Sequence, residues 1–267
     1  MLDITNLNYG YSGKRDVLLK NINLHIARGE NVGIVGPNGC GKTTLIKLVQ
    51  GILKPGSGSI RYKGNRVAWG DQCQGMAYVG DPEFTTENLG LPANRTVGSV
   101  IDTLLALNGK TRDTAVNKVF ETLKVTHLFE KAIAHLSAGE RKRVMLSLLF
   151  LQEPELIILD EPFEWLDKEM RPYLMNRLKE FYCSKRTGIL LISHNDIEID
   201  HLTDKVYRLE NGELREIPQK RFLVKMDAPG SQYEEQKKGV AISNIIDLME
   251  VPGRTDETIT IQLKQVI

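Results

Sequence analysis

A glycine-rich segment between two apolar runs limits how this chain can fold. It reads Gly36-Pro37-Asn38-Gly39-Cys40-Gly41-Lys42-Thr43-Thr44. The apolar residues 32–35 lead into it and the mostly apolar residues 45–49 lead out of it, which predicts a strand, a tight loop and a helix. In that context the pattern G-x-x-x-x-G-K-[ST] is typical of a loop that binds phosphate groups. We call residues 36–44 the phosphate loop.

The residue types in this loop suit phosphate binding. Glycines carry no Cβ atom, so the backbone N–H groups stay open to surround a phosphate chain. The following helix start adds unpaired N–H donors and the positive end of a dipole. Lys42 is placed to reach the β- and γ-phosphates of a nucleotide, and the Thr43 hydroxyl to ligate Mg²⁺. A glycine-rich turn that only caps a helix is the alternative, which the flanking patterns disfavour.

Composition excludes several classes of protein. The chain has 267 residues and a formal net charge of +1, so it has no general attraction to nucleic acid or acidic lipid. Cys40, Cys73 and Cys183 form no C-x-x-C pair, which argues against a disulfide framework or a zinc site and fits a reducing cytosol. We expect no signal peptide at the N-terminus and no membrane-spanning helix.

Strand-like and helix-like runs alternate along the chain. Strands are expected at residues 2–7, 22–26, 59–62, 76–79, 156–159 and 189–192, with a hairpin at 204–217. Helical spacing of apolar residues covers about 96–129, 139–152 and 168–182. Apolar strands that alternate with helices predict a parallel sheet covered on both faces.

Chemically active residues follow several of the expected strands. The phosphate loop, Asp81, the pair Asp160-Glu161 and His194 all stand at carboxyl ends of strands, where ligands bind in such sheets. Asp160 is expected to hold Mg²⁺, and Glu161, which points elsewhere, to serve as general base for a water molecule. The alternatives are acids that cap a strand end, a histidine satisfied at a strand end, and an aspartate that begins a turn before Pro82.

A second helix start has anion-binding character. Ser137-Ala138-Gly139-Glu140 fits a capping box, which is a common way to begin a helix. It also gives the chain a second helix N-terminus suited to phosphate. Two such ends on different parts of one chain allow two copies to sandwich a nucleotide. We call residues 137–140 the signature segment.

These residues together carry a family resemblance. Over about residues 2–217 the chain resembles the ATP-binding subunit of ABC transporters. The resemblance rests on GPNGCGKTT at residues 36–44, LSAGE at 136–140, LIILDEP at 156–162 and SH at 193–194, in the order typical of that family. It implies that the chain binds ATP with Mg²⁺ and works as a head-to-tail dimer of cassettes.

The resemblance also implies individual roles. Tyr11 matches the aromatic residue that stacks on adenine, Glu161 the catalytic base and His194 the residue that contacts the γ-phosphate. Each ATP is then expected between the phosphate loop of one copy and Ser137 and Gly139 of the other. Asp167 matches the end of a loop that crosses the dimer interface. Thr43, Asp160 and Asp81 are the expected metal ligands.

The predicted fold class is α/β, with a P-loop NTPase core and a mixed sheet covered by helices. An antiparallel β part precedes this core, and a helical subdomain at about residues 82–137 is inserted into it, where the resemblance implies docking on the membrane partner. We expect one ABC ATPase domain over residues 1–217. Residues 218–267 are expected to form a small α/β appendage, because residues 234–249 have helical apolar spacing.

The chain departs from the family pattern in three places. Asp81 stands where a glutamine is usual, Glu164-Trp165 replace the usual small residues before Leu166-Asp167, and Ala138 and Glu140 replace glycine and glutamine in the signature segment. The first change affects the expected metal site, and the second affects the close packing of the dimer.

The function predicted from all this is the ATP-binding and hydrolysing subunit of a multi-chain ABC membrane transporter. It would lie in the cytoplasm, peripheral to the cell membrane, with a separate transmembrane subunit and a second cassette as partners. One alternative is a soluble ABC ATPase that acts on nucleic acid or ribosomes, which the near-zero charge disfavours. Another is a weakly hydrolysing, nucleotide-dependent regulator. Cargo stays open, and the short tail slightly favours export by analogy alone.

Overall fold

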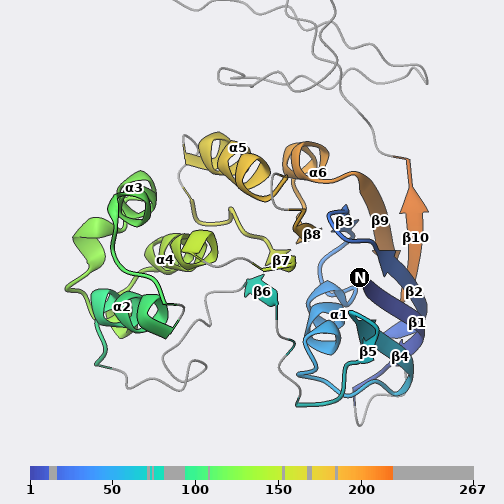
Figure 1. Cartoon of the computed structure of the whole chain (residues 1–267). Coiled ribbons are helices and arrows are strands. Elements are labelled where there is room, and N and C mark those ends of the chain that lie inside the picture. The colour runs from blue at the N-terminus through green and yellow to red at the C-terminus, as the bar shows by residue number, and fades with distance from the viewer. Residues whose placement is uncertain are drawn as a thin grey trace, which may run out of the picture. The chain divides into compact units, whose positions relative to one another are not determined.

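The computed structural model describes residues 1–11, 17–70, 73, 75–80, 94–107, 109–151, 154–166, 170–183 and 186–218 (Figure 1). These residues belong to one compact unit, Met1–Pro218. The expected appendage at 218–267 lies outside the described residues, apart from Pro218 itself, and stays a prediction.

An antiparallel sheet forms the N-terminal part. Its strands are β1 (Leu2–Tyr9), β2 (Leu19–Ile26), β4 (Ser57–Tyr62) and β5 (Asn65–Arg66), in the order β2-β1-β4-β5. Leu2 lies opposite both Ile26 and Tyr62. From Ile22 to Ile26 alternate side chains of β2 are buried, which is the period expected of a sheet with one face on the core. The strands predicted at 2–7, 22–26 and 59–62 are confirmed.

A mixed sheet of six strands holds the remaining strands. They are β3 (Asn31–Val35), β6 (Met76–Val79), β7 (Leu156–Asp160), β8 (Gly188–Ile192), β9 (Lys205–Glu210) and β10 (Glu213–Ile217), in the order β10-β9-β3-β8-β7-β6. All neighbours pair in parallel except β9 and β10, which form the predicted hairpin. The turn residues Asn211 and Gly212 both have positive φ, as a type I′ turn requires.

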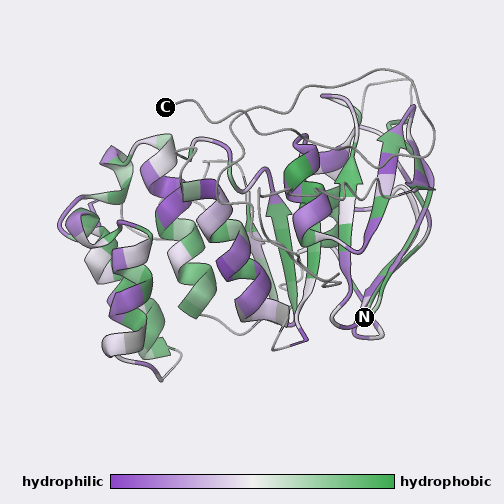
Figure 2. Ribbon diagram, turned by 90° about the horizontal axis from the view of Figure 1, so that it is seen from above, coloured by the Kyte–Doolittle hydropathy of each residue, from purple (hydrophilic) through white to green (hydrophobic). Residues whose placement is uncertain are grey.

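Helices cover both faces of the mixed sheet (Figure 1). Helix α1 (Lys42–Val49) packs between this sheet and the antiparallel sheet, where its buried leucines join Leu156 and Ile158 in one core cluster. Helices α4 (Ala138–Leu151), α5 (Met170–Cys183) and α6 (Asp196–Leu202) cover the other face. The central strands are coloured as hydrophobic in Figure 2 because both of their faces are buried.

A helical region stands between β6 and α4. It contains α2 (Val97–Leu107), α3 (Thr114–Thr122) and two short 3₁₀ turns, η1 (Thr126–Leu128) and η2 (Ile133–His135). The helical spacing predicted at about 96–129 is thus divided, because Asp113 caps the start of α3 by accepting from Val116 N–H at 2.8 Å. Within the described residues, the helices are too short or too polar to cross a bilayer.

Candidate active site

The phosphate loop lies where β3 meets α1, and its glycines allow close approaches. A Cβ atom on Gly36 would lie 2.2 Å from the carbonyl oxygen of Leu209 in β9. Gly41 is the N-cap of α1 and has φ 111°, a backbone conformation that other residues rarely adopt. A Cβ atom on Gly39 would meet open space. The backbone is therefore packed against β9 on one side and open on the other.

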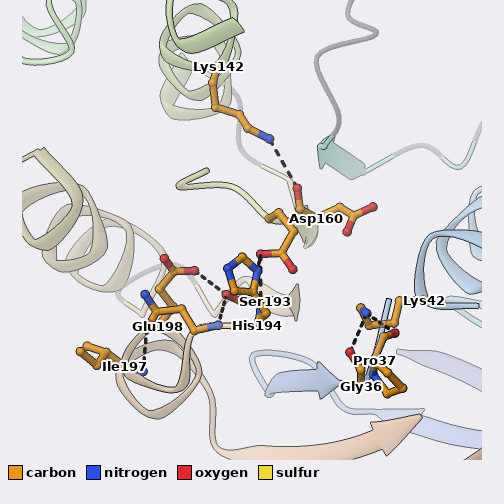
Figure 3. Close-up of polar contacts among 11 residues, drawn as sticks. Gly36, Pro37, Lys42, Lys142, Asp160, Ser193, His194, Ile197 and Glu198 are labelled. Atoms are coloured by element: carbon orange, nitrogen blue, oxygen red, sulfur yellow. Dashed lines mark hydrogen bonds and ion pairs between the residues drawn. The ribbon is translucent and has the colours of Figure 1, made fainter. Parts of the chain in front are cut away.

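The other loop residues surround this opening. Pro37, Asn38 and Gly39 are exposed, whereas Cys40 is a half-buried free thiol whose N–H donates to the Pro37 carbonyl at 3.4 Å. Lys42 lies back over the loop, and its Nζ donates to the carbonyl oxygens of Gly36 at 2.8 Å and Pro37 at 3.0 Å (Figure 3). The ammonium group thus spans the opening of the loop, where an anion would compete with those carbonyls.

Thr43 and Asp160 meet across the site. The Thr43 hydroxyl donates to Asp160 Oδ2 at 3.1 Å, which joins the start of α1 to the end of β7. Asp160 is buried, and burial raises the pKa of its carboxyl group above the ordinary value, while the Thr43 hydrogen bond opposes the rise. A hydroxyl and a carboxylate are the hard oxygen ligands that Mg²⁺ prefers. Two protein oxygens leave room for waters and phosphate oxygens, so the residues fit this ion.

Glu161 turns away from its neighbour Asp160. Its backbone has φ 46°, in the left-handed region, and its N–H donates to the Ile192 carbonyl at 2.9 Å. This turn brings Glu161 Oε2 to 3.0 Å from His194 Nδ1 and 3.4 Å from the His194 N–H. The His194 side chain is 71% exposed, whereas that of Glu161 is 23% exposed. The expected base and the expected histidine therefore lie in contact.

A buried hydrogen-bonded pair, Ser193 and Glu198, holds the loop that carries His194. Ser193 Oγ donates to Glu198 Oε2 at 2.6 Å and accepts from the Asn195 N–H at 3.0 Å (Figure 3). Both Ser193 and Glu198 are buried, and burial raises the pKa of the Glu198 carboxyl group. Sequence reasoning did not single out Glu198, because an acid in the first turn of a helix is usually exposed.

A buried lysine joins the signature helix to two strand ends. Lys142 in α4 is 2% exposed, and its Nζ donates to the Gly80 carbonyl oxygen at 2.8 Å. The same Nζ donates to the Asp160 carbonyl oxygen at 3.4 Å (Figure 3). Sequence reasoning missed this residue. The signal was its helical register, because Lys142 stands four and seven positions before the buried residues Leu146 and Leu149.

The signature segment begins α4 as the predicted capping box. The Ser137 N–H donates to Glu140 Oε2 at 2.7 Å, and the Glu140 N–H donates to Ser137 Oγ at 3.3 Å. A Cβ atom on Gly139 would lie 2.7 Å from the carbonyl oxygen of Trp165, so the loop after β7 passes directly over this helix start. Trp165 has φ 66° and a ring that is 61% exposed.

Tyr11 lies beside the phosphate loop. Its hydroxyl is 3.0 Å from Thr44 Oγ1, and its ring packs edge-on against Tyr9. It is 40% exposed, so a ring face stays available next to the loop. Asp81 and Asp167, the remaining predicted site residues, lie outside the described residues.

Comparison with known proteins identifies the family. The sequence model of the family described as ABC transporter matches residues 19–164. The chain belongs to the ABC transporter family. It is 36% identical over 197 residues to the zinc import ATP-binding protein ZnuC of Psychrobacter cryohalolentis. The aligned residues cover 73% of this chain and 74% of that protein. It is 30% identical to the energy-coupling factor transporter ATP-binding protein EcfA1 of Ligilactobacillus salivarius, with 91% of each chain covered.

A solved cassette supports the same fold. A dimeric ATP-binding cassette bound to ADP and phosphate superposes with a TM-score of 0.66 and 22% identity, over 83% of this chain and all of that one, which is likeness of fold alone. The α/β class, with an antiparallel sheet before a mixed sheet, is confirmed. Family membership also confirms that this ABC protein is an ATP-binding ATPase coupled to transport.

Proposed function

We propose that two copies of the cassette, or this cassette and a related one, bind ATP head to tail. Each nucleotide would lie between the phosphate loop of one copy and the signature segment of the other. The observation that carries this proposal is the Thr43–Asp160 hydrogen bond, which joins the phosphate loop to the end of β7, where Glu161 follows. The signature segment stands at the start of a different helix, and a helix start of this kind can bind an anion.

Within one site we assign the following roles. Lys42 would leave the Gly36 and Pro37 carbonyls and bind the β- and γ-phosphates. Thr43 and Asp160 would hold Mg²⁺, which supplies positive charge to the phosphate oxygens. Glu161 would orient a water and accept its proton, with His194 beside it on the γ-phosphate side. The Tyr11 ring would stack on the adenine.

Two proposed residues lie outside the described part of the chain. Asp81 is proposed to reach Mg²⁺ through a water molecule, because aspartate is one methylene shorter than the usual glutamine would be. Asp167 is proposed to end the loop that crosses to the second cassette. The exposed Trp165 would lie in the same loop.

Family membership supports a proposal for the partner and the location. We propose that the chain lies on the cytoplasmic face of a membrane and drives a separate transmembrane subunit. The relative from Psychrobacter is named as an import protein, so we favour import over the export suggested by the short tail. The transported substrate stays open, because in a multi-chain transporter the separate membrane subunit would select it.

The central test is Glu161→Gln. This change keeps the ligands of the phosphates and the metal but removes the base, so we expect ATP binding within about twofold of wild type and turnover reduced by about 10²–10⁴-fold. ATP should hold the variant as a dimer, which light scattering measures with and without MgATP. The control is Glu213→Gln, an exposed acid on the far hairpin. Turnover at the wild-type rate in Glu161→Gln would show that another group is the base.

A further inference from the structure

The carboxylate of Glu140 is shared between the signature segment and a lysine from the preceding helical region. Lys131 Nζ donates to Glu140 Oε1 at 3.0 Å and to Oε2 at 2.8 Å. Glu140 Oε2 also accepts the Ser137 N–H at 2.7 Å. One acid therefore joins the lysine to the residue that is proposed to bind the ATP of the second cassette.

Lys131 is itself held at both backbone groups. Its N–H donates to the Leu128 carbonyl at 2.9 Å, and its own carbonyl accepts from the Val97 N–H at the start of α2 at 3.0 Å. The next residue, Ala132, forms an isolated bridge with Thr96. The side chain of Lys131 is 38% exposed and that of Glu140 is 17% exposed. The backbone of Lys131 is therefore bonded to the start of α2, while its ammonium group contacts Glu140 in α4.

A carboxylate at this place raises an electrostatic problem. The Lys131 hydrogen bond and the Ser137 N–H lower the pKa of Glu140 to about 2, so Glu140 is ionised at every pH where the protein works. An acid in the first turn of a helix is favourable for the helix itself. It is unfavourable for phosphate at the same helix start, because two negative groups would meet there. A neutral glutamine would create no such repulsion.

We propose that Lys131 is a positioning residue that makes this helix start competent for phosphate. It neutralises Glu140 while leaving that carboxylate in place to hold the Ser137 N–H. Ser137 then presents its hydroxyl and the helix N–H groups to the ATP of the second cassette without opposing charge. This inference rests on the proposed head-to-tail binding. It also gives α2 a route to the site, since Val97 holds the backbone of Lys131.

The test measures ATP-driven dimerisation of the full chain in a Glu161→Gln background, by light scattering at increasing MgATP. Lys131→Met should weaken dimerisation by about fivefold to tenfold. Lys131→Arg should keep it, because arginine retains the charge and the two hydrogen bonds. ATP binding to the monomer, followed with a fluorescent ATP analogue, should stay within about twofold in both variants, since Lys131 lies outside the phosphate loop.

A double-mutant cycle separates neutralisation from ordinary structural support. In a Glu140→Gln background there is no charge to neutralise, so Lys131→Met should then change dimerisation by less than about twofold. If Lys131→Met weakens dimerisation as much with glutamine at position 140 as with the original glutamate, the proposal is overturned. Lys205→Met is the matched control, because Lys205 also pairs with a glutamate, Glu30, away from the signature segment. It should leave dimerisation unchanged.

One further variant distinguishes this inference from the proposed function. Ser137→Tyr places a bulky ring at the signature segment and should abolish ATP-driven dimerisation. If the Ser137→Tyr variant still dimerises with ATP, the head-to-tail proposal is wrong and this inference falls with it. If Ser137→Tyr blocks dimerisation but Lys131→Met does not weaken it, only the role of Lys131 is wrong.

Discussion

Burial of Asp160 disfavours the charged form of its carboxyl group in the free protein. Its carboxyl group is buried at the end of β7, and its polar neighbours are the Thr43 hydroxyl and the more distant ammonium groups of Lys142 and Lys42. A buried carboxylate is costly in the absence of a full partner, and binding of a metal ion would offset that cost. The site therefore gives up some stability of the free protein for ligand binding.

Asp160→Asn should stabilise the free protein at neutral pH and lower its MgATP turnover strongly. The folded-state pKa of Asp160 is raised, so its ionisation at neutral pH favours unfolding. The gain from asparagine should be present above the raised pKa and should shrink as the pH falls toward the ordinary carboxyl value. Thermal unfolding between pH 8 and pH 4 measures it, with a gain of about 1 kcal/mol raising Tm by about 2–4 °C. A gain that grows on acidification would contradict this account.

Helix α4 links the signature segment to the ends of β6 and β7. Its first turn carries the signature segment, and one turn later Lys142 reaches the ends of β6 and β7. A buried ammonium group requires hydrogen-bond acceptors, and here the backbone carbonyls of Gly80 and Asp160 supply two of them. Because one of these carbonyls belongs to Asp160, which is proposed to hold Mg²⁺, a shift of α4 would alter the proposed nucleotide site.

Lys142→Met should destabilise the fold and slow turnover more than it weakens ATP binding. Removing the ammonium group leaves buried carbonyls unpaired, which costs about 1–3 kcal/mol in the free energy of unfolding. Chemical denaturation and ATPase rates at saturating ATP give the two effects separately. Lys110→Met is the control, since Lys110 donates to the Leu151 carbonyl at the other end of the same helix. Equal loss of turnover in both variants would show that only stability is at stake.

At the scale of the whole molecule, the elements that carry the described site residues all lie in one unit. Both sheets, the covering helices and the hairpin β9–β10 lie within Met1–Pro218. β9 also forms the wall against which Gly36 packs, so the site depends on the hairpin at the end of this unit. We therefore expect nucleotide binding to need residues up to about Ile217 and none beyond.

Truncation after Pro218 should leave a folded protein whose ATP affinity stays within a few fold of the full chain. Equilibrium binding of a fluorescent ATP analogue and thermal unfolding are the measurements. A matched truncation after Thr203, which removes β9 and β10, should abolish folding, because it exposes one side of β3. If the protein that ends at Pro218 folds but no longer binds ATP, residues 219–267 take part in the site.

Local patterns in the sequence determined much of the secondary structure and predicted most residues of the candidate site. The phosphate loop, the apolar strand before Asp160-Glu161 and the capping box at Ser137 are each encoded within about ten residues, because glycine conformation, apolar period and helix capping are local effects. The fold class followed from the order of such segments. The roles of all the predicted site residues stay predictions, including those of Asp81 and Asp167.

Only the tertiary structure decided which distant groups meet. The contact of Glu161 with His194, the reach of Lys142 to two strand ends and the sharing of Glu140 with Lys131 join residues from different elements. Their spacing along the chain follows no motif, because pairing depends on how the parallel strands and α4 are packed rather than on any local preference. The left-handed backbone of Glu161 is likewise imposed by its bond to Ile192, which no neighbour in sequence dictates.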